Sequence, residues 1–295
     1  MIVRLALAQW LIGEPADFDA FATRVQAAIE RHAAAGVHIV VWPEYLSLEL
    51  AAMFEAEVRG DFVRSLAALQ AYHPAYVDLF ATEARRHGLY LLAGTFLHAQ
   101  PDGRYRNRAL LFTPDGDCLW QDKLTLTGFE RQAGVIEPGD ELCVFDTAFG
   151  RLAVNVCYDS EFPLYARAQC EAGARLILLP SCTDTPAGAT RVRVGGMARA
   201  LENQVYVAQA VTAGVAPWSP ALDINTGIAA VYAPSDRGLP PDGLVACAAH
   251  DSEWLVTDID LDLLVRVREH GQVANAADWG RQLRPDVARA RVLRG

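Results

Sequence analysis

The chain has 295 residues, of which 52% are hydrophobic, and its formal net charge is −10. This composition allows a large core, and the acidic balance argues against a nucleic-acid partner, which would need a basic face. No stretch approaches the roughly 20 apolar residues of a membrane span, so we expect a soluble, cytoplasmic protein that has no membrane partner.

Six cysteines are scattered along the chain, at positions 118, 143, 157, 170, 182 and 247. None belongs to a Cys-x-x-Cys pair and none has a histidine at metal-ligand spacing, so we expect no metal site. A disulfide framework is not expected in so large a chain either. Each cysteine is therefore either a small core residue or a candidate for a reactive thiol.

The first elements alternate between strand and helix patterns. Residues 2–9 form an apolar run that we interpret as a buried strand, since a signal peptide would end in a clear cleavage site. Asp17 is placed to cap a helix with an apolar stripe, which ends at Gly36. Residues 38–42 form a second buried strand that stops just before Glu44. Strand, helix and strand in this order predict an α/β fold.

The middle of the chain changes from helices to hairpins. Residues 46–75 are predicted to be a mixture of helix and loop, and a helix is predicted for residues 76–87. Apolar runs separated by Asp-Gly turn signals then predict an antiparallel ladder of hairpins over residues 90–121. Lys123 follows this ladder immediately.

The second half of the chain again mixes strands with helices. The predicted strands cover residues 143–147, 151–156, 176–179, 205–211, 227–233, 244–248 and 255–260. The predicted helices cover residues 164–172 and 193–203, and a Pro/Gly loop is predicted over residues 180–188. The pattern favours an α/β sandwich with mixed sheets in one domain, and it lacks the regular alternation of a barrel.

Three polar residues stand where apolar strands end, which is where open α/β sheets place their ligand sites: Glu44, Lys123 and Cys157. A cysteine nucleophile needs a base, and Glu44 is a candidate because an apolar setting makes a carboxylate more basic. Lys123 and the backbone N–H of Tyr158 are candidates for stabilising the oxyanion of a tetrahedral intermediate. A helix N-terminus at Pro163 and a nearby cation would favour the thiolate of Cys157.

Each of these residues also has an ordinary structural explanation. Cys157 would be a small core residue, Glu44 would cap the next helix, and Lys123 would be an exposed surface residue. Asp159 is expected to orient the turn after Cys157, and Arg199 is expected to belong to a structural ion-pair cluster. Only the combination of a carboxylate, an ammonium and a thiol indicates catalysis.

Four segments of the chain, in this order and at similar spacing, resemble the signature segments of the carbon-nitrogen hydrolase (nitrilase) superfamily. They are Val41–Glu44, Asp122–Thr125, Asn155–Pro163 and Arg199–Val207. The resemblance covers nearly the whole chain, so we expect a single domain over residues 1–275 and a C-terminal tail over residues 276–295. It implies a four-layer α-β-β-α sandwich that forms a homodimer or a higher homo-oligomer.

The resemblance also implies roles for the site residues. Glu44 would be the general base, Lys123 the oxyanion stabiliser and Cys157 the nucleophile, and no metal or organic cofactor would be needed. A second glutamate often follows the lysine in this family and orients both the lysine and the substrate. Glu130 is the best match for this second glutamate, and Glu137 is the alternative.

The sequence defines the substrate less well. At Leu124 and Leu164 the chain departs from the residues often found in the family, which weakens any transfer of substrate identity. Thr183 and Asp184 are candidates for substrate contacts, although an ordinary Pro/Gly connection explains their loop equally well. The resemblance implies a thiol amidohydrolase acting on a small amide. Nitrile hydrolysis and acyl transfer to an amine are alternatives on the same site, and a non-catalytic binding module is a third.

Overall fold

Strand β1 (Ile2–Leu11) links the two β-sheets of the fold. In the computed structural model, which describes residues 1–293, most of β1 lies in the first sheet and its last residues pair with the second. The first sheet has the order β5 (Cys118–Asp122), β4 (Tyr105–Phe112), β3 (Tyr90–Ala99), β2 (Ile39–Val41), β1 and β13 (Trp254–Asp260). The second has the order β6 (Phe145–Thr147), β7 (Gly150–Val154), β8 (Leu176–Ser181), β9 (Tyr206–Val215), β11 (Ala230–Tyr232) and β12 (Leu244–Cys247), and β10 (Ile224–Asn225) pairs with the end of β9.

The side chains of β1 serve two separate cores, because successive residues of a strand point to opposite faces. Leu5 belongs to the apolar cluster that joins the two sheets, together with Val154 of β7. Trp10, on the opposite face of the strand, belongs to the cluster under the first helix, together with Phe21. The apolar run at the start of the sequence is therefore a strand buried on both faces, as predicted.

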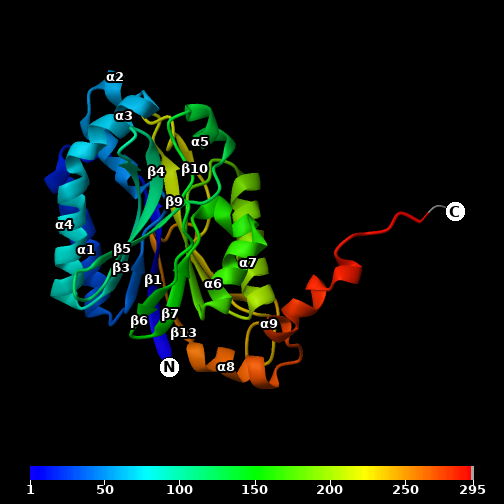
Figure 1. Cartoon of the computed structure of the whole chain (residues 1–295). Helices are drawn as coiled ribbons and strands as arrows, with labels where there is room; N and C mark the ends of the chain where they lie inside the picture. The colour runs from blue at the N-terminus through cyan, green and yellow to red at the C-terminus, as the bar shows by residue number, and fades with distance from the viewer. Residues whose placement is uncertain (294–295) are drawn as a thin grey trace.

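Helices cover the outer face of each sheet, which makes four layers (Figure 1). Helices α1 (Phe18–Ala34) and α4 (His73–His87) cover the first sheet, and α6 (Pro163–Glu171) and α7 (Pro186–Asn203) cover the second. Helix α1 begins as predicted after Asp17, whose carboxylate accepts a hydrogen bond from the N–H of Ala20 at 2.8 Å. The predicted four-layer α-β-β-α fold is confirmed.

The other helical segments lie between or after these layers, and some of them are 3-10 helices denoted η. They are η1 (Leu46–Met53), α2 (Ala56–Arg59), α3 (Phe62–Leu69), η2 (Gln70–Tyr72), α5 (Gly128–Ala133), η3 (Cys157–Glu161), α8 (Leu261–His270), α9 (Asn275–Asp278), η4 (Trp279–Leu283) and η5 (Pro285–Val287). The end of the chain runs away from the layers (Figure 1). Residues 294 and 295 of the expected tail lie outside the described residues. Within residues 1–293, no helix has the length and apolar character needed to cross a membrane.

Two element bounds near the site differ from the sequence predictions. Strand β7 ends at Val154, and the chain turns into η3, so Cys157 begins a 3-10 turn and does not directly precede helix α6. Helix α7 begins at Pro186 and not at residue 193. Its early start is explained by Thr185, whose side chain caps the helix by accepting a hydrogen bond from the N–H of Gly188 at 3.1 Å.

Candidate active site

The ends of three strands bring Glu44, Lys123 and Cys157 to one place. Glu44 follows β2 and Lys123 follows β5 in the first sheet, whereas Cys157 follows β7 in the second. All three side chains line the same cavity, which has a volume of about 260 Å³. The structure therefore brings together the three residues that the sequence singled out at strand ends.

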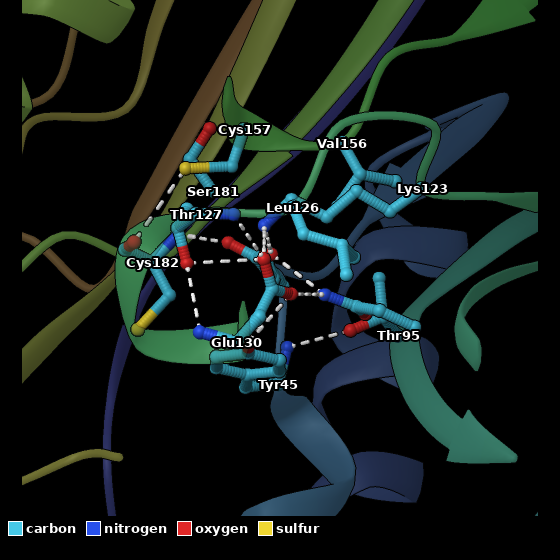
Figure 2. A network of polar contacts seen from close by, with 12 residues as sticks. Tyr45, Thr95, Lys123, Leu126, Thr127, Glu130, Val156, Cys157, Ser181 and Cys182 are labelled. Atoms are coloured by element: carbon cyan, nitrogen blue, oxygen red, sulfur yellow. Dashed lines mark hydrogen bonds and ion pairs between the residues drawn. The ribbon is translucent and has the colours of Figure 1, made fainter. Parts of the chain in front are cut away.

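Lys123 is the centre of a buried ion network (Figure 2). Its ammonium nitrogen lies 2.8 Å from Oε1 of Glu44 and 2.9 Å from Oε2 of Glu130, and its side chain is only 1% exposed. Burial alone would lower the pKa of Lys123, but the carboxylates of Glu130 and Glu44 outweigh burial and raise this pKa well above its usual value. The lysine is therefore an ammonium ion at neutral pH, held between two carboxylates.

Glu130 is fixed by the start of helix α5. Its Oε2 accepts a hydrogen bond from the N–H of Thr127 at 2.8 Å, and Oγ1 of Thr127 accepts one from the N–H of Glu130, which completes a capping box. Its Oε1 accepts hydrogen bonds from Tyr45 at 2.9 Å and from Asn107 at 3.0 Å. Burial acts to raise the pKa of Glu130, but Lys123 and these donors lower it on balance. Glu130 is therefore a rigidly held carboxylate.

Glu137, the alternative to Glu130, lies elsewhere. Its carboxylate pairs with Nε of Arg106 at 2.7 Å and is not among the residues that line the cavity. Of the two glutamates that follow the lysine in sequence, Glu130 is the one in contact with Lys123.

Glu44 accepts hydrogen bonds from several directions. Besides Lys123, the amide of Asn107 donates to Oε1 at 2.8 Å, and the backbone N–H of Cys182 donates to Oε2 at 3.0 Å. Burial is the largest influence on the pKa of Glu44 and raises it, Lys123 opposes this effect, and the resulting pKa is above the usual value for glutamate. A carboxylate held in place with a raised pKa has the properties of a general base.

Cys157 has an unusual backbone conformation. Its φ is 47°, in the left-handed region that is costly for a residue with a Cβ atom and that is often found at functional sites. The thiol is 4% exposed and lies 3.5 Å from the carbonyl oxygen of Cys182 (Figure 2). The turn thus directs the sulfur toward the loop that also donates to Glu44.

The protonation state of Cys157 differs from the sequence expectation. Burial raises the pKa of this thiol well above its usual value, Glu44 raises it further, and the ammonium of Lys123 offsets only part of the effect. The ammonium of Lys123 thus favours the thiolate as expected, but burial and Glu44 outweigh it, and the η3 turn separates Cys157 from the start of helix α6. The thiol keeps its proton at neutral pH, so a nucleophilic role requires a base.

Asp159 ties the lysine segment to the cysteine turn. Its buried carboxylate accepts hydrogen bonds from the N–H groups of Thr125 at 2.8 Å, Leu124 at 3.1 Å and Val156 at 3.4 Å. Burial raises the pKa of Asp159 to about 7, although Lys123 and the backbone donors act in the opposite direction. Asp159 thus orients more than its own turn, because it also holds the residues that follow Lys123.

The remaining predicted site residues surround the mouth of the cavity. Tyr158, Thr183 and Asp184 all line it, together with Asp223 from the loop before β10. Arg199 instead donates to the backbone carbonyl of Ser160 at 3.2 Å and pairs with Glu202, as expected of a structural residue. Within residues 1–293, no group of three or more His, Cys, Asp or Glu side chains is arranged to hold a metal ion.

Comparisons with known proteins place the chain in a family. The sequence profile of the carbon-nitrogen hydrolases matches residues 4–269. The chain belongs to the carbon-nitrogen hydrolase family. This membership confirms the predicted fold class and the prediction that the chain carries an enzyme of this family.

Two relatives and one solved structure illustrate the family likeness. The chain is 32% identical over 282 residues to the probable hydrolase YhcX of Bacillus subtilis, and this match covers 95% of the chain and 54% of that protein. It therefore spans about half the length of this relative. It is 29% identical to omega-amidase NIT2-B of Xenopus laevis over 67% of the chain and 74% of that protein. A carbon-nitrogen hydrolase from Helicobacter pylori G27 has the same fold, with a TM-score of 0.74, 19% identity, and coverage of 96% of this chain and 98% of that one.

The sequence did not predict three residues that contribute hydrogen bonds to the site of this carbon-nitrogen hydrolase. Tyr45 and Asn107 both donate to Glu130, and the backbone of Cys182 contacts both Glu44 and Cys157. Asn107 is a polar residue within a predicted strand, and this was its only sequence signal. The signal is weak, because the neighbouring residues of the same strand are also polar. Cys182 acts through its backbone, so its residue type carries no signal at all.

Proposed function

We propose that this carbon-nitrogen hydrolase is a thiol amidase, which cleaves the C–N bond of a small amide through a thioester on Cys157. The proposal is carried by one observation, the convergence of Cys157, Glu44 and the ammonium of Lys123 on one cavity of about 260 Å³. A cavity of this size suits a small molecule. The relative named an omega-amidase supports amides as the substrate class.

In the first half of the reaction, Glu44 accepts the thiol proton while Sγ of Cys157 attacks the carbonyl carbon of the amide. A C–S bond forms, and an electron pair of the C=O bond moves to oxygen, which gives a tetrahedral oxyanion. Glu44 then donates its proton to the nitrogen, the C–N bond breaks, and ammonia or an amine leaves a thioester behind. The raised pKa of Glu44 supports this role, because a more basic carboxylate takes a thiol proton more readily.

Lys123 is proposed to stabilise the oxyanion. An ammonium has three N–H donors, and the contacts with Glu44 and Glu130 use two of them, which leaves one for the substrate oxygen. The backbone N–H of Tyr158 is the proposed second donor, because Tyr158 follows Cys157 directly and lines the cavity. Donors that are already in place stabilise a developing negative charge without reorganisation.

In the second half of the reaction, Glu44 accepts a proton from a water molecule, whose oxygen attacks the thioester carbonyl. The C–S bond breaks, the sulfur of Cys157 regains a proton, and the carboxylic acid leaves. Glu130 contacts Lys123 but does not line the cavity, so we propose it as a positioning residue that keeps Lys123 charged and correctly oriented. Thr183 and Asp184 are proposed substrate contacts at the mouth.

Nitrile hydrolysis and acyl transfer would use the same three side chains, so the deciding experiment compares substrates. Ammonia release is measured for a panel of small amides, for the corresponding nitriles, and for amides with an added amine acceptor. The proposed amidase releases ammonia from amides without an acceptor. Turnover of nitriles alone, or a strict need for the acceptor, would reassign the reaction. The absence of any turnover, together with a Cys157 that no thiol reagent modifies, would indicate a binding protein.

The homodimer expected from the family resemblance remains a proposal. Its support is a set of exposed apolar side chains on the outer helices α6 and α7, namely Leu164, Val194 and Leu201. Exposed apolar patches commonly mark protein interfaces. Light scattering on the purified chain would give a mass twice that of the monomer if the proposal is correct.

A further inference from the structure

The mouth of the cavity carries more negative than positive side chains. Glu161 lies at the end of η3, Asp184 in the loop before α7, and Asp223 in the loop before β10, and all three line the cavity. Among residues 1–293, the cavity lining contains two cations, the buried Lys123 and Arg191 of α7. Three separate segments of the chain thus direct carboxylates toward the entrance of the same site.

The charges around the cavity are only partly balanced. The ammonium of Lys123 is neutralised by two buried carboxylates, and Nε of Arg191 lies 3.5 Å from Oε1 of Glu161. Asp184 and Asp223 make no ion pair within the part of the chain that the structure describes, and both are exposed. Two carboxylates at the mouth are therefore free to interact with a ligand.

The segments that carry these two carboxylates are fastened to the protein. Thr183 accepts a hydrogen bond from the N–H of Thr226 at 2.8 Å and donates through Oγ1 to the carbonyl of Thr226 at 2.6 Å. The carbonyl of Asp223 accepts a hydrogen bond from the N–H of Ala216 at 3.1 Å. The backbone positions of Asp184 and Asp223 are thus held before any ligand arrives, which lowers the entropic cost of binding.

The mouth is also connected directly to the nucleophile. The N–H of Cys182 donates to Glu44 at 3.0 Å, and its carbonyl lies 3.5 Å from the thiol of Cys157. Asp184 follows two residues later on the same segment. A small amide whose carbonyl carbon lies at the sulfur of Cys157 would therefore extend its other end along this segment, toward the free carboxylates.

We infer that the preferred amide carries a cationic group, an ammonium or a guanidinium, at the end remote from the bond that is cleaved. This inference rests on the proposed amidase function and adds the substrate class. A cation at the mouth is attracted by Asp184 and Asp223, whereas a carboxylate is repelled by both. Each exposed pair is worth a factor of about two to five in affinity, so cationic and anionic amides should differ about tenfold or more.

The first test compares three amides that share one methylene chain: δ-aminovaleramide (cationic), hexanamide (neutral) and adipamic acid (anionic). The ratio of kcat/KM for the cationic to the anionic amide should be about ten or more and should fall as salt is added, because salt screens exposed charges. The double variant Asp184→Asn/Asp223→Asn should bring the ratio close to one. A ratio cancels any general loss of activity in the variant.

A matched control removes the same charge elsewhere. Asp78 and Asp251 are exposed and do not line the cavity, so Asp78→Asn/Asp251→Asn should keep the wild-type ratio. The inference is overturned if hexanamide or adipamic acid is hydrolysed as efficiently as δ-aminovaleramide, or if the control changes the ratio as much as the cavity variant does. If none of the three amides is hydrolysed while other amides of the wider panel are, the inference is overturned and the amidase function stands; if no amide of that panel is hydrolysed, the proposed function itself fails.

A second measurement reports the charge of the mouth without turnover. Methanethiosulfonate reagents with an aminoethyl, a methyl or a sulfonatoethyl group modify Cys157, and each rate is divided by the rate of the same reagent with β-mercaptoethanol. The modification is followed on the peptide that contains Cys157 by mass spectrometry. The cationic reagent should react fastest and the anionic reagent slowest. Equal normalised rates would contradict the inference even if the enzyme is an active amidase.

Discussion

Replacing Glu130 by glutamine removes one of the two carboxylates that hold the ammonium of Lys123, at a distance of 2.9 Å. Glutamine has nearly the same shape, so Tyr45 and Asn107 keep an oxygen to which they can donate. The amide nitrogen of glutamine cannot accept the hydrogen bond from the N–H of Thr127, however, so one of the two hydrogen bonds of the capping box is lost. Glu130→Gln therefore tests the charge of this side chain more than its volume.

The structure sets the expected magnitudes. Breaking a buried ion pair costs about 3–5 kcal/mol, and we expect about 3 kcal/mol in the free energy of unfolding because Glu44 continues to pair with Lys123. Complete loss of a well-placed oxyanion donor lowers kcat about a hundredfold. Glu130→Gln leaves Lys123 in place, so this figure is the upper limit of the expected decrease in kcat, and KM should change little. The pKa of Lys123 is raised by Glu130 as well as by Glu44. Without Glu130 this pKa falls, so the loss of activity at alkaline pH should begin at a lower pH.

The assay combines urea unfolding with the pH dependence of ammonia release, and Glu137→Gln is the matched control. Glu137 is 21% exposed and pairs with Arg106, which also contacts Asp140, so its replacement should cost less than about 1 kcal/mol and should leave the pH profile unchanged. A Glu130→Gln enzyme with wild-type kcat and pH profile would refute the role assigned to Glu130. An equal loss in the Glu137→Gln enzyme would refute it as well.

Three further predictions concern the other side chains of the site. Cys157→Ser should lower kcat by about a thousandfold or more, whereas Cys182→Ser should keep most activity, because Cys182 contacts the site through backbone atoms. If Cys182→Ser lost more activity than Cys157→Ser in an ammonia-release assay, Cys157 would be excluded as the nucleophile. Glu44 must be ionised to accept a proton, and its pKa is raised above the usual value of 4.5, so kcat/KM should rise with pH through a midpoint above 4.5. A value of kcat/KM that does not change with pH in this range would contradict the role of Glu44 as the general base. Asp159→Asn leaves the backbone N–H groups of Leu124 and Thr125 facing an amide, which should lower the free energy of unfolding by about 1–3 kcal/mol. The value of kcat should fall about tenfold, whereas the affinity for substrate should change little. An unchanged kcat would show that the hydrogen bonds of Asp159 do not position Lys123.

The site residues that could be predicted from the sequence are those that directly follow an apolar strand. Glu44, Lys123 and Cys157 each follow such a run, and open α/β sheets place their ligand sites at strand ends, so their convergence was foreseeable. Glu130 was harder, because Glu130 and Glu137 both follow the lysine and only the capping box with Thr127 separates them. That motif was present in the sequence as a Thr and a Glu three residues apart, before a helix.

Other features of the site depend on packing and have no local sequence signal. Cys182 follows β8 in the second sheet, and Glu44 follows β2 in the first sheet. Their hydrogen bond therefore depends on how the two sheets pack against each other. The pKa of Cys157 is raised by burial, which depends on what covers the thiol and not on the neighbouring residues in sequence. The sequence shows the cation that favours the thiolate and the base that takes its proton, but it does not show how deeply the thiol is buried.

The most direct test of the mechanism is the detection of the covalent intermediate. Wild-type enzyme is mixed with a small amide, quenched in acid within the turnover time, digested and analysed by mass spectrometry. The peptide containing Cys157 should carry the acyl group of the amide, hydroxylamine should remove this group, and the peptide containing Cys182 should remain unmodified. Turnover in which Cys157 never acquires the acyl group, and which persists in Cys157→Ala, would contradict the account.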